Sequence, residues 1–139
     1  MCRNEMGRGE DPGVRCALLV EEHAVFRQAM AYLLARDLRV ELVEEAATLA
    51  EARALALKDL GSIDVMVSEL ALPDGEATDF LTALLEAQAD VPVLVLTFRG
   101  DRPSRERALE LGAARVMSKE AHIGEIFEAI GELGSLGDR

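Results

Sequence analysis

The sequence predicts an α/β fold: a five-stranded parallel sheet in the order 2-1-3-4-5, with helices on both faces. Two observations predict it. Apolar, strand-like runs alternate along the chain with segments whose apolar residues recur at helical spacing, a pattern that favours right-handed βαβ crossovers. The first, third and fourth strand-like runs are the most apolar, as strands at the centre of such a sheet should be.

Each strand-like run is closed by polar or turn residues and followed by a helical pattern. The second run alternates apolar and polar residues, which favours a place near an edge of the sheet. The third run ends at Pro73-Asp74-Gly75, a strong turn signal. The five expected strands span residues 14–20, 38–43, 63–68, 93–97 and 114–118.

The helices are predicted from the spacing of apolar residues and from capping signals. The first helix turns one apolar face inward, the second begins with the capping-box pattern Thr48 to Glu51, and the fourth begins at Asp101 with Pro103 in its first turn. The residues expected to face the core are Phe26, Ala29, Met30, Leu33 and Leu34 in the first helix, Leu81, Leu84 and Leu85 in the third, and Ile123, Ile126, Phe127 and Ile130 in the fifth.

A chain of 139 residues is expected to form one domain. Residues 1–13 are polar and glycine-containing, without the apolar core of a signal peptide, so we interpret them as a flexible leader. The domain is then expected over residues 14–133, followed by a flexible tail over residues 134–139.

Composition narrows the classes of partner and the location. The net charge of −11 disfavours direct binding to nucleic acid, which needs clustered Lys and Arg. There is no apolar run long enough to span a bilayer, so no membrane contact is expected. Cys2 and Cys16 lack metal-ligand spacing, and we expect a reduced, cytoplasmic protein.

Chemically interesting side chains gather at one predicted edge of the sheet. Glu69 stands at the carboxyl end of the third strand, in the stretch where an open parallel sheet binds its ligands. The pair Glu21-Glu22 follows the first strand, Thr97 ends the fourth, and Lys119 follows the fifth. Their convergence predicts an acidic pocket with one lysine.

With these marks in order, the chain resembles the receiver domain of bacterial two-component response regulators, of the kind that precedes a LuxR- or NarL-type output module. The resemblance covers roughly residues 14–131 and implies a flavodoxin-like receiver fold. It implies that Glu69 is the equivalent of the phosphoacceptor Asp, that Glu21, Glu22 and Glu69 form the acidic pocket that holds Mg²⁺, and that Thr97 and Lys119 contact the phosphoryl oxygens.

The sequence departs from the family pattern at the acceptor. Glu reaches one bond further than Asp, roughly 1.5 Å, and a misplacement of about 1 Å can cost on the order of 10²-fold in rate. Glu69 is therefore expected to be a poor acceptor and a partial mimic of the phosphorylated state. Phe98 replaces a small residue, and Val116 replaces a frequent aromatic switch residue; both are assigned to the switch or interaction face.

The leading functional hypothesis is an atypical receiver domain in phosphorelay signalling that works through protein contacts and is not an enzyme. Its expected partners are a histidine kinase or an output protein, and a homodimer stays open. The first alternative is the regulatory portion of a LuxR-type transcriptional regulator whose DNA-binding module lies outside this chain. A remote alternative is a Mg²⁺-dependent phosphohydrolase, disfavoured because Glu21-Glu22 replaces the Asp-x-Asp pattern. Mg²⁺ binding is left open and disfavoured, since three Glu side chains fit the strict octahedral geometry of Mg²⁺ poorly.

Overall fold

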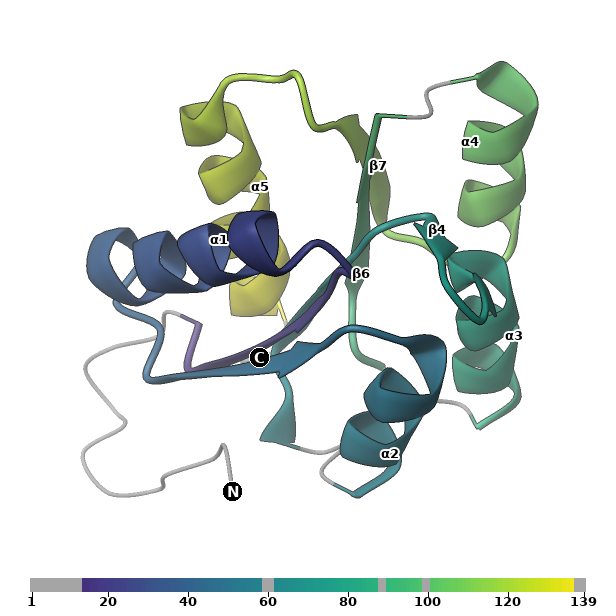
Figure 1. The fold of residues 1–139 in the computed structure, drawn as a ribbon, viewed down its shortest axis with the longest axis horizontal. Coiled ribbons are helices and arrows are strands. Elements are labelled where there is room, and N and C mark those ends of the chain that lie inside the picture. The colour runs from purple at the N-terminus through teal and green to yellow at the C-terminus, as the bar shows by residue number, and fades with distance from the viewer. Residues whose placement is uncertain (1–13, 59–61, 88–89, 99–100, 137–139) are drawn as a thin grey trace.

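The predicted sheet is present in the computed structural model, which describes residues 14–58, 62–87, 90–98 and 101–136. Five parallel strands lie in the order β2-β1-β3-β6-β7, which is the predicted order 2-1-3-4-5 (Figure 1). The strands of this sheet are β1 (Cys16–Val20), β2 (Leu42–Ala46), β3 (Val65–Ser68), β6 (Val93–Thr97) and β7 (Arg115–Ser118).

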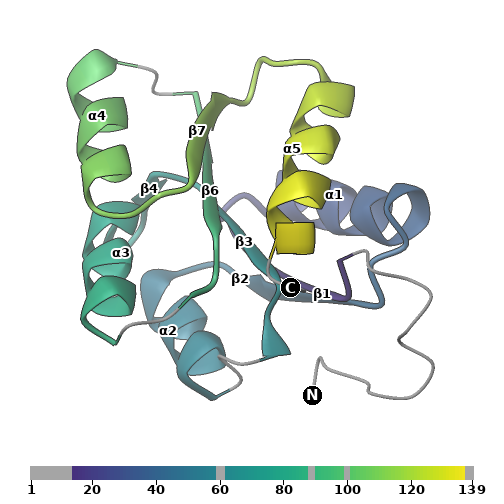
Figure 2. The same ribbon diagram turned by 180° about the vertical axis from the view of Figure 1, so that it is seen from behind.

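Helices cover both faces of the sheet. One face packs against α1 and α5, and the other packs against α2, α3 and α4 (Figures 1 and 2). The strands contribute alternate residues to the two cores, as the period of two in a strand requires. The helices are α1 (Ala24–Asp37), α2 (Leu49–Lys58), α3 (Ala77–Glu86), α4 (Arg102–Glu110) and α5 (Ile123–Leu136).

A two-stranded hairpin that the sequence did not predict follows Glu69. Its strands are β4 (Ala71–Leu72) and β5 (Gly75–Glu76), joined at the predicted Pro-Asp-Gly turn. Gly75 has a φ of +148°, a backbone conformation that favours glycine. Asp74 in this turn accepts hydrogen bonds from the backbone N–H groups of Leu49 and Ala50, at 2.8 Å and 3.0 Å, and so caps α2.

The predicted position of the second strand was wrong. The strand begins at Leu42, not at residue 38, because α1 continues to Asp37 and Leu38 forms its C-cap. Arg39 then adopts a φ of +57°, and the Val40 N–H donates to the carbonyl of Leu34 at 3.2 Å. Leu38 and Val40 thus pack on the core as part of the helix end, which is why their apolar alternation imitated a strand.

Three residues predicted to face the core are exposed. Ala29 of α1 is exposed, Leu85 of α3 is 59% exposed and Ile123 of α5 is 49% exposed, because each lies at the border of its helix's buried face. The predicted end of the domain at residue 133 falls inside α5, where Gly134 packs against Val14. The proposed leader, residues 1–13, and residues 137–139 of the tail lie outside the described residues.

Two further observations concern the cysteines and the apolar character of the helices. Cys16 has no exposed surface, as expected for a residue in a core strand. The other cysteine, Cys2, lies outside the described residues. In the described part of the chain, no helix combines the length and the apolar character needed to cross a membrane.

Candidate functional site: an ion triad at the carboxyl edge of the sheet

Four of the five predicted pocket residues are fixed by the hydrogen-bond ladder of the sheet as it continues past the strand ends. The Glu21 N–H donates to the carbonyl of Ala46 at 2.9 Å, and the Glu69 N–H donates to that of Val20 at 2.9 Å. The Lys119 N–H donates to the carbonyl of Thr97 at 3.0 Å. Backbones in parallel register therefore bring residues far apart in sequence to one edge.

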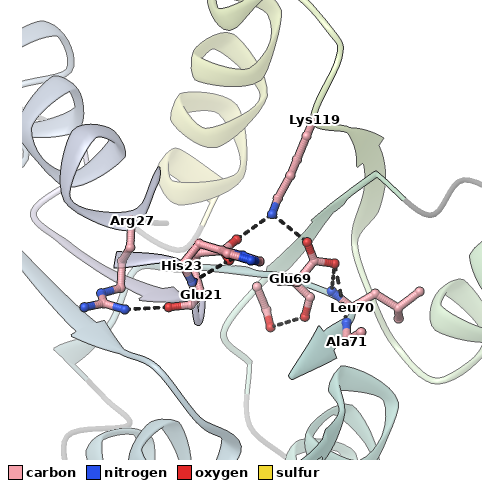
Figure 3. Close-up of polar contacts among 8 residues, drawn as sticks. Glu21, His23, Arg27, Glu69, Leu70, Ala71 and Lys119 are labelled. Carbon is pink, nitrogen blue, oxygen red and sulfur yellow. Dashed lines mark hydrogen bonds and ion pairs between the residues drawn. The ribbon is translucent and has the colours of Figure 1, made fainter. Parts of the chain in front are cut away.

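Lys119 lies between the carboxylates of Glu21 and Glu69, which were predicted to converge at this edge. Its Nζ is 2.6 Å from Oε1 of Glu21 and 2.6 Å from Oε1 of Glu69. Both contacts are drawn in Figure 3. Only 4% of the Lys119 side chain is exposed, with 7% for Glu21 and 11% for Glu69. We call these three residues the ion triad; with two carboxylates and one ammonium, its formal charge is −1.

The second oxygen of Glu69 points back to its own backbone. Oε2 accepts a hydrogen bond from the Leu70 N–H at 2.6 Å, and the Ala71 N–H lies at 3.4 Å (Figure 3). Both oxygens of this carboxylate are thus engaged, one by a cation and one by a backbone amide. Such bonds hold the Glu69 side chain in one orientation.

The second oxygen of Glu21 is engaged at the start of α1. Its Oε2 accepts from the His23 N–H at 3.0 Å and lies 3.0 Å from His23 Nδ1. Arg27 donates to the Glu21 carbonyl at 2.7 Å (Figure 3). It also donates to Oε1 of Glu45 at 2.9 Å, which ties the loop to β2. His23, for which no role in the site was predicted, is the N-cap residue of α1 and a direct partner of Glu21.

The contacts of the triad shift the pKa values of Glu21 and Lys119. Burial acts to raise the pKa of Glu21, but hydrogen bonds from Lys119 and His23 outweigh it, so this pKa lies below the ordinary value. Burial acts to lower the pKa of Lys119, but its bonds to Glu21 and Glu69 outweigh it, so this pKa is raised. The charged forms of Glu21 and Lys119 are therefore favoured near neutral pH.

The remaining predicted residues lie around the triad in different settings. Thr97 is buried at the end of β6, and Val116 is 8% exposed within β7. Phe98 is 67% exposed, and Glu22 is also exposed. Glu22 forms no ion pair with the triad in the described part of the chain, because adjacent residues leave a strand end in opposite directions.

Two aromatic rings approach the Lys119 ammonium from outside the carboxylates. The ring centroid of Phe26 lies 4.6 Å from Nζ and that of Phe98 lies 5.4 Å away, both within cation–π range. Phe26 was predicted as a core residue of the first helix and not as part of the site. Its place at the site depends on how α1 crosses the sheet, which the helical periodicity does not specify.

The donor set, as arranged, does not fit Mg²⁺. Glu21 and Glu69 share an ammonium group where a metal ion would need their oxygens, and Glu22 is directed elsewhere. Among the residues with described positions, no three acidic, His or Cys side chains are placed to hold a metal ion together. We therefore derive no chemical step through Mg²⁺.

Comparisons with known proteins identify the family to which this fold belongs. The family model described as the response regulator receiver domain matches residues 17–131. The receiver domain of HemR from Leptospira biflexa, in its non-phosphorylated form, is 30% identical with a TM-score of 0.76, and the match covers 87% of this chain and 94% of that one.

Two longer proteins are similar over this region. The DNA-binding transcriptional activator DevR/DosR of Mycobacterium tuberculosis is 30% identical over 117 residues, which is 84% of this chain and 53% of that protein. Protein-glutamate methylesterase/protein-glutamine glutaminase 2 of Cereibacter sphaeroides is 36% identical over 106 residues, 73% of this chain and 28% of that protein. The chain thus spans about half the length of the first and about a quarter of the second. With the sheet order, the triad at its carboxyl edge and the family match over most of its length, the chain belongs to the response regulator receiver domain family.

Proposed function

We propose that this chain is an atypical receiver domain that acts in phosphorelay-type signal transduction through protein contacts, without phosphorylation. One observation carries the proposal: Glu69, at the phosphoacceptor-equivalent position, is ion-paired with Lys119 at 2.6 Å. The lysine that would contact an incoming phosphoryl group already has two carboxylate partners.

The ion pair works against phosphoryl transfer in two ways. Attack on a phosphodonor requires a carboxylate oxygen placed in line, and Glu69 has one oxygen on Lys119 and the other at the Leu70 amide. Stabilising the transferred group requires a cation whose charge is not already neutralised. Both conditions would require the triad to break first.

The same contacts support a fixed signalling conformation. A phosphorylated acceptor carries nearly two negative charges and can pair with the lysine, whereas Glu69 offers one charge in a similar place. We propose that the Glu69–Lys119 pair holds the surrounding loops in one state. Val116 and Phe98 belong to the switch or interaction face in this account, with Phe98 offering exposed apolar surface.

The partners proposed for this face are a histidine kinase or an output protein. A homodimer is a further possibility, which a measurement of the molar mass in solution tests. A non-enzymatic role is part of the proposal, since all four carboxylate oxygens of Glu21 and Glu69 are already engaged by Lys119 or by backbone N–H groups. The remote phosphohydrolase alternative gains no support from Glu21, whose carboxylate is bonded to Lys119 and His23. The cytoplasm is the proposed location, where kinases and transcription factors would meet it.

A second candidate function is the regulatory portion of a LuxR-type transcriptional regulator. It is favoured by the relative named as a DNA-binding transcriptional activator, about half of whose length this chain matches. DNA binding would then belong to a separate module. Sequencing the full reading frame for a helix-turn-helix region after this domain distinguishes the two candidates.

Intact mass after incubation with Mg²⁺ and a small acyl phosphate tests the proposal, with the wild type and a Glu69→Asp variant side by side. We expect an unmodified wild type and a variant that gains one phosphoryl group, because Asp restores the shorter reach. Covalent phosphorylation of the wild type would overturn the proposal. If neither protein is modified, loss of phosphorylation extends beyond Glu69 to the rest of the pocket.

A further inference from the structure

Aromatic residues are scarce in this chain, and their distribution is uneven. The sequence has four Phe, one Tyr and no Trp. Two of the four Phe rings, those of Phe26 and Phe98, lie within 6 Å of the same ammonium group. They come from α1 and from the residue after β6, which are far apart in sequence.

The two rings differ in burial and in how they pack against the rest of the protein. Phe26 is half-buried and packs against the core between α1 and the sheet. Phe98 is 67% exposed, an unusual setting for a Phe, so core packing does not account for its position. The Lys119 side chain beneath it is nevertheless only 4% exposed.

We propose that Phe26 and Phe98 form an aromatic clamp that positions the Lys119 ammonium between Glu21 and Glu69. The ring faces carry negative charge density, and each lies within cation–π range of the ammonium. Phe98 is the removable half of the clamp because it is mainly outside the core. Both are positioning residues that act through Lys119.

The clamp has a defined chemical consequence. The Lys119 amine is held with carboxylates on two sides and aromatic rings on others, so a small reagent reaches it slowly. Removing the Phe98 ring opens one side and removes one attraction. We expect the reactivity of Lys119 to rise by about two- to fivefold, the range that corresponds to one cation–π contact at an exposed site.

The experiment measures trace acetylation of the whole chain at mildly alkaline pH. The sequence contains only two lysines, Lys58 and Lys119, so Lys58 serves as the internal reference for reagent activity. Cleavage at arginine places the two lysines on separate peptides, whose acetylation is read by mass spectrometry. The measured quantity is the ratio of the Lys119 rate to the Lys58 rate, followed across pH.

Three variants at Phe98 and one control make the result specific. Phe98→Ala and Phe98→Leu are expected to raise the ratio, since Leu keeps the apolar bulk but lacks a ring face. Phe98→Tyr keeps the ring and should show the same ratio and pH profile as the wild type. Leu85→Ala removes an apolar side chain on α3 that is 59% exposed, close to the 67% of Phe98, and should leave the ratio unchanged.

If Phe98→Ala has the same ratio of Lys119 to Lys58 acetylation as the wild type, the clamp is overturned. If Phe98→Leu has the wild-type ratio, the aromatic character of the clamp is overturned. The exposure of Phe98 means that these variants should stay folded, which circular dichroism checks. The inference rests on the ion triad that the proposed function also uses, but labelling involves no phosphoryl transfer. A wild type that accepts a phosphoryl group while labelling as expected would overturn the proposed function and leave the clamp standing.

Discussion

Replacing Lys119 with Met removes the one cation that Glu21 and Glu69 share. Each paired oxygen lies 2.6 Å from Nζ, so the two oxygens are at most roughly 5 Å apart. At an effective dielectric constant of about 20, two like charges at that separation repel by about 3 kcal/mol. Protonating one carboxyl group at pH 7 costs a similar amount, since each pKa unit corresponds to about 1.4 kcal/mol. We therefore expect Lys119→Met to lose about 3 kcal/mol of stability at pH 7.

Urea unfolding followed by circular dichroism measures this loss. Arg102→Met is the matched control, because it removes a cation from an ion pair whose side chains are 88% and 57% exposed. The control should unfold at nearly the wild-type urea concentration. The deficit of Lys119→Met should also shrink as the pH falls toward 4, because a protonated carboxyl group no longer repels its neighbour. Equal stability of the two variants would refute the claim that the triad is a tightly coupled buried cluster.

Three further predictions follow from individual contacts. The pKa of Glu21 in the folded protein lies below its ordinary value of 4.5, so the ionised carboxylate stabilises the fold at pH values above 4.5. This stability is lost as the pH falls through the lowered pKa. Glu21→Gln should therefore make the loss of stability at acid pH less steep. Asp74→Ala removes the acceptor for two N–H groups of α2, so Tm should fall and amide exchange at Leu49 should accelerate, with Asp74→Asn in between. Gly134→Ala places a Cβ inside the van der Waals radius of Val14, so urea unfolding should show a loss of about 1–3 kcal/mol that Val14→Ala partly restores; equal losses in both backgrounds would contradict the packing.

The fold was predictable because its central strands are apolar runs of the right length. The runs that became β1, β3 and β6 are buried on both faces, and their order followed from that burial. The prediction failed where a short apolar pattern is compatible with more than one structure. Leu38 and Val40 alternate like a strand but close a helix, and Leu85 lies just past the buried face of α3.

The site was predictable where it depends on backbone register. Glu21, Glu69 and Lys119 each follow a strand of one parallel sheet, so their convergence follows from topology. Sequence spacing could not separate Glu21 from Glu22, since only one of two adjacent residues turns inward. It also could not place Phe26 over the ammonium, because that contact depends on the crossing of α1 over the sheet.

The coupling between Lys119 and Glu69 is the most direct measure of the central claim, that this carboxylate is held by the lysine rather than free to accept a phosphoryl group. A double-mutant cycle with Lys119→Met and Glu69→Gln isolates it through four unfolding measurements. We expect Glu69→Gln to destabilise the wild type but to stabilise the Lys119→Met variant, where it removes a repelling charge, with a coupling energy of at least about 1 kcal/mol. The same effect of Glu69→Gln in both backgrounds, within about 0.5 kcal/mol, would contradict the account.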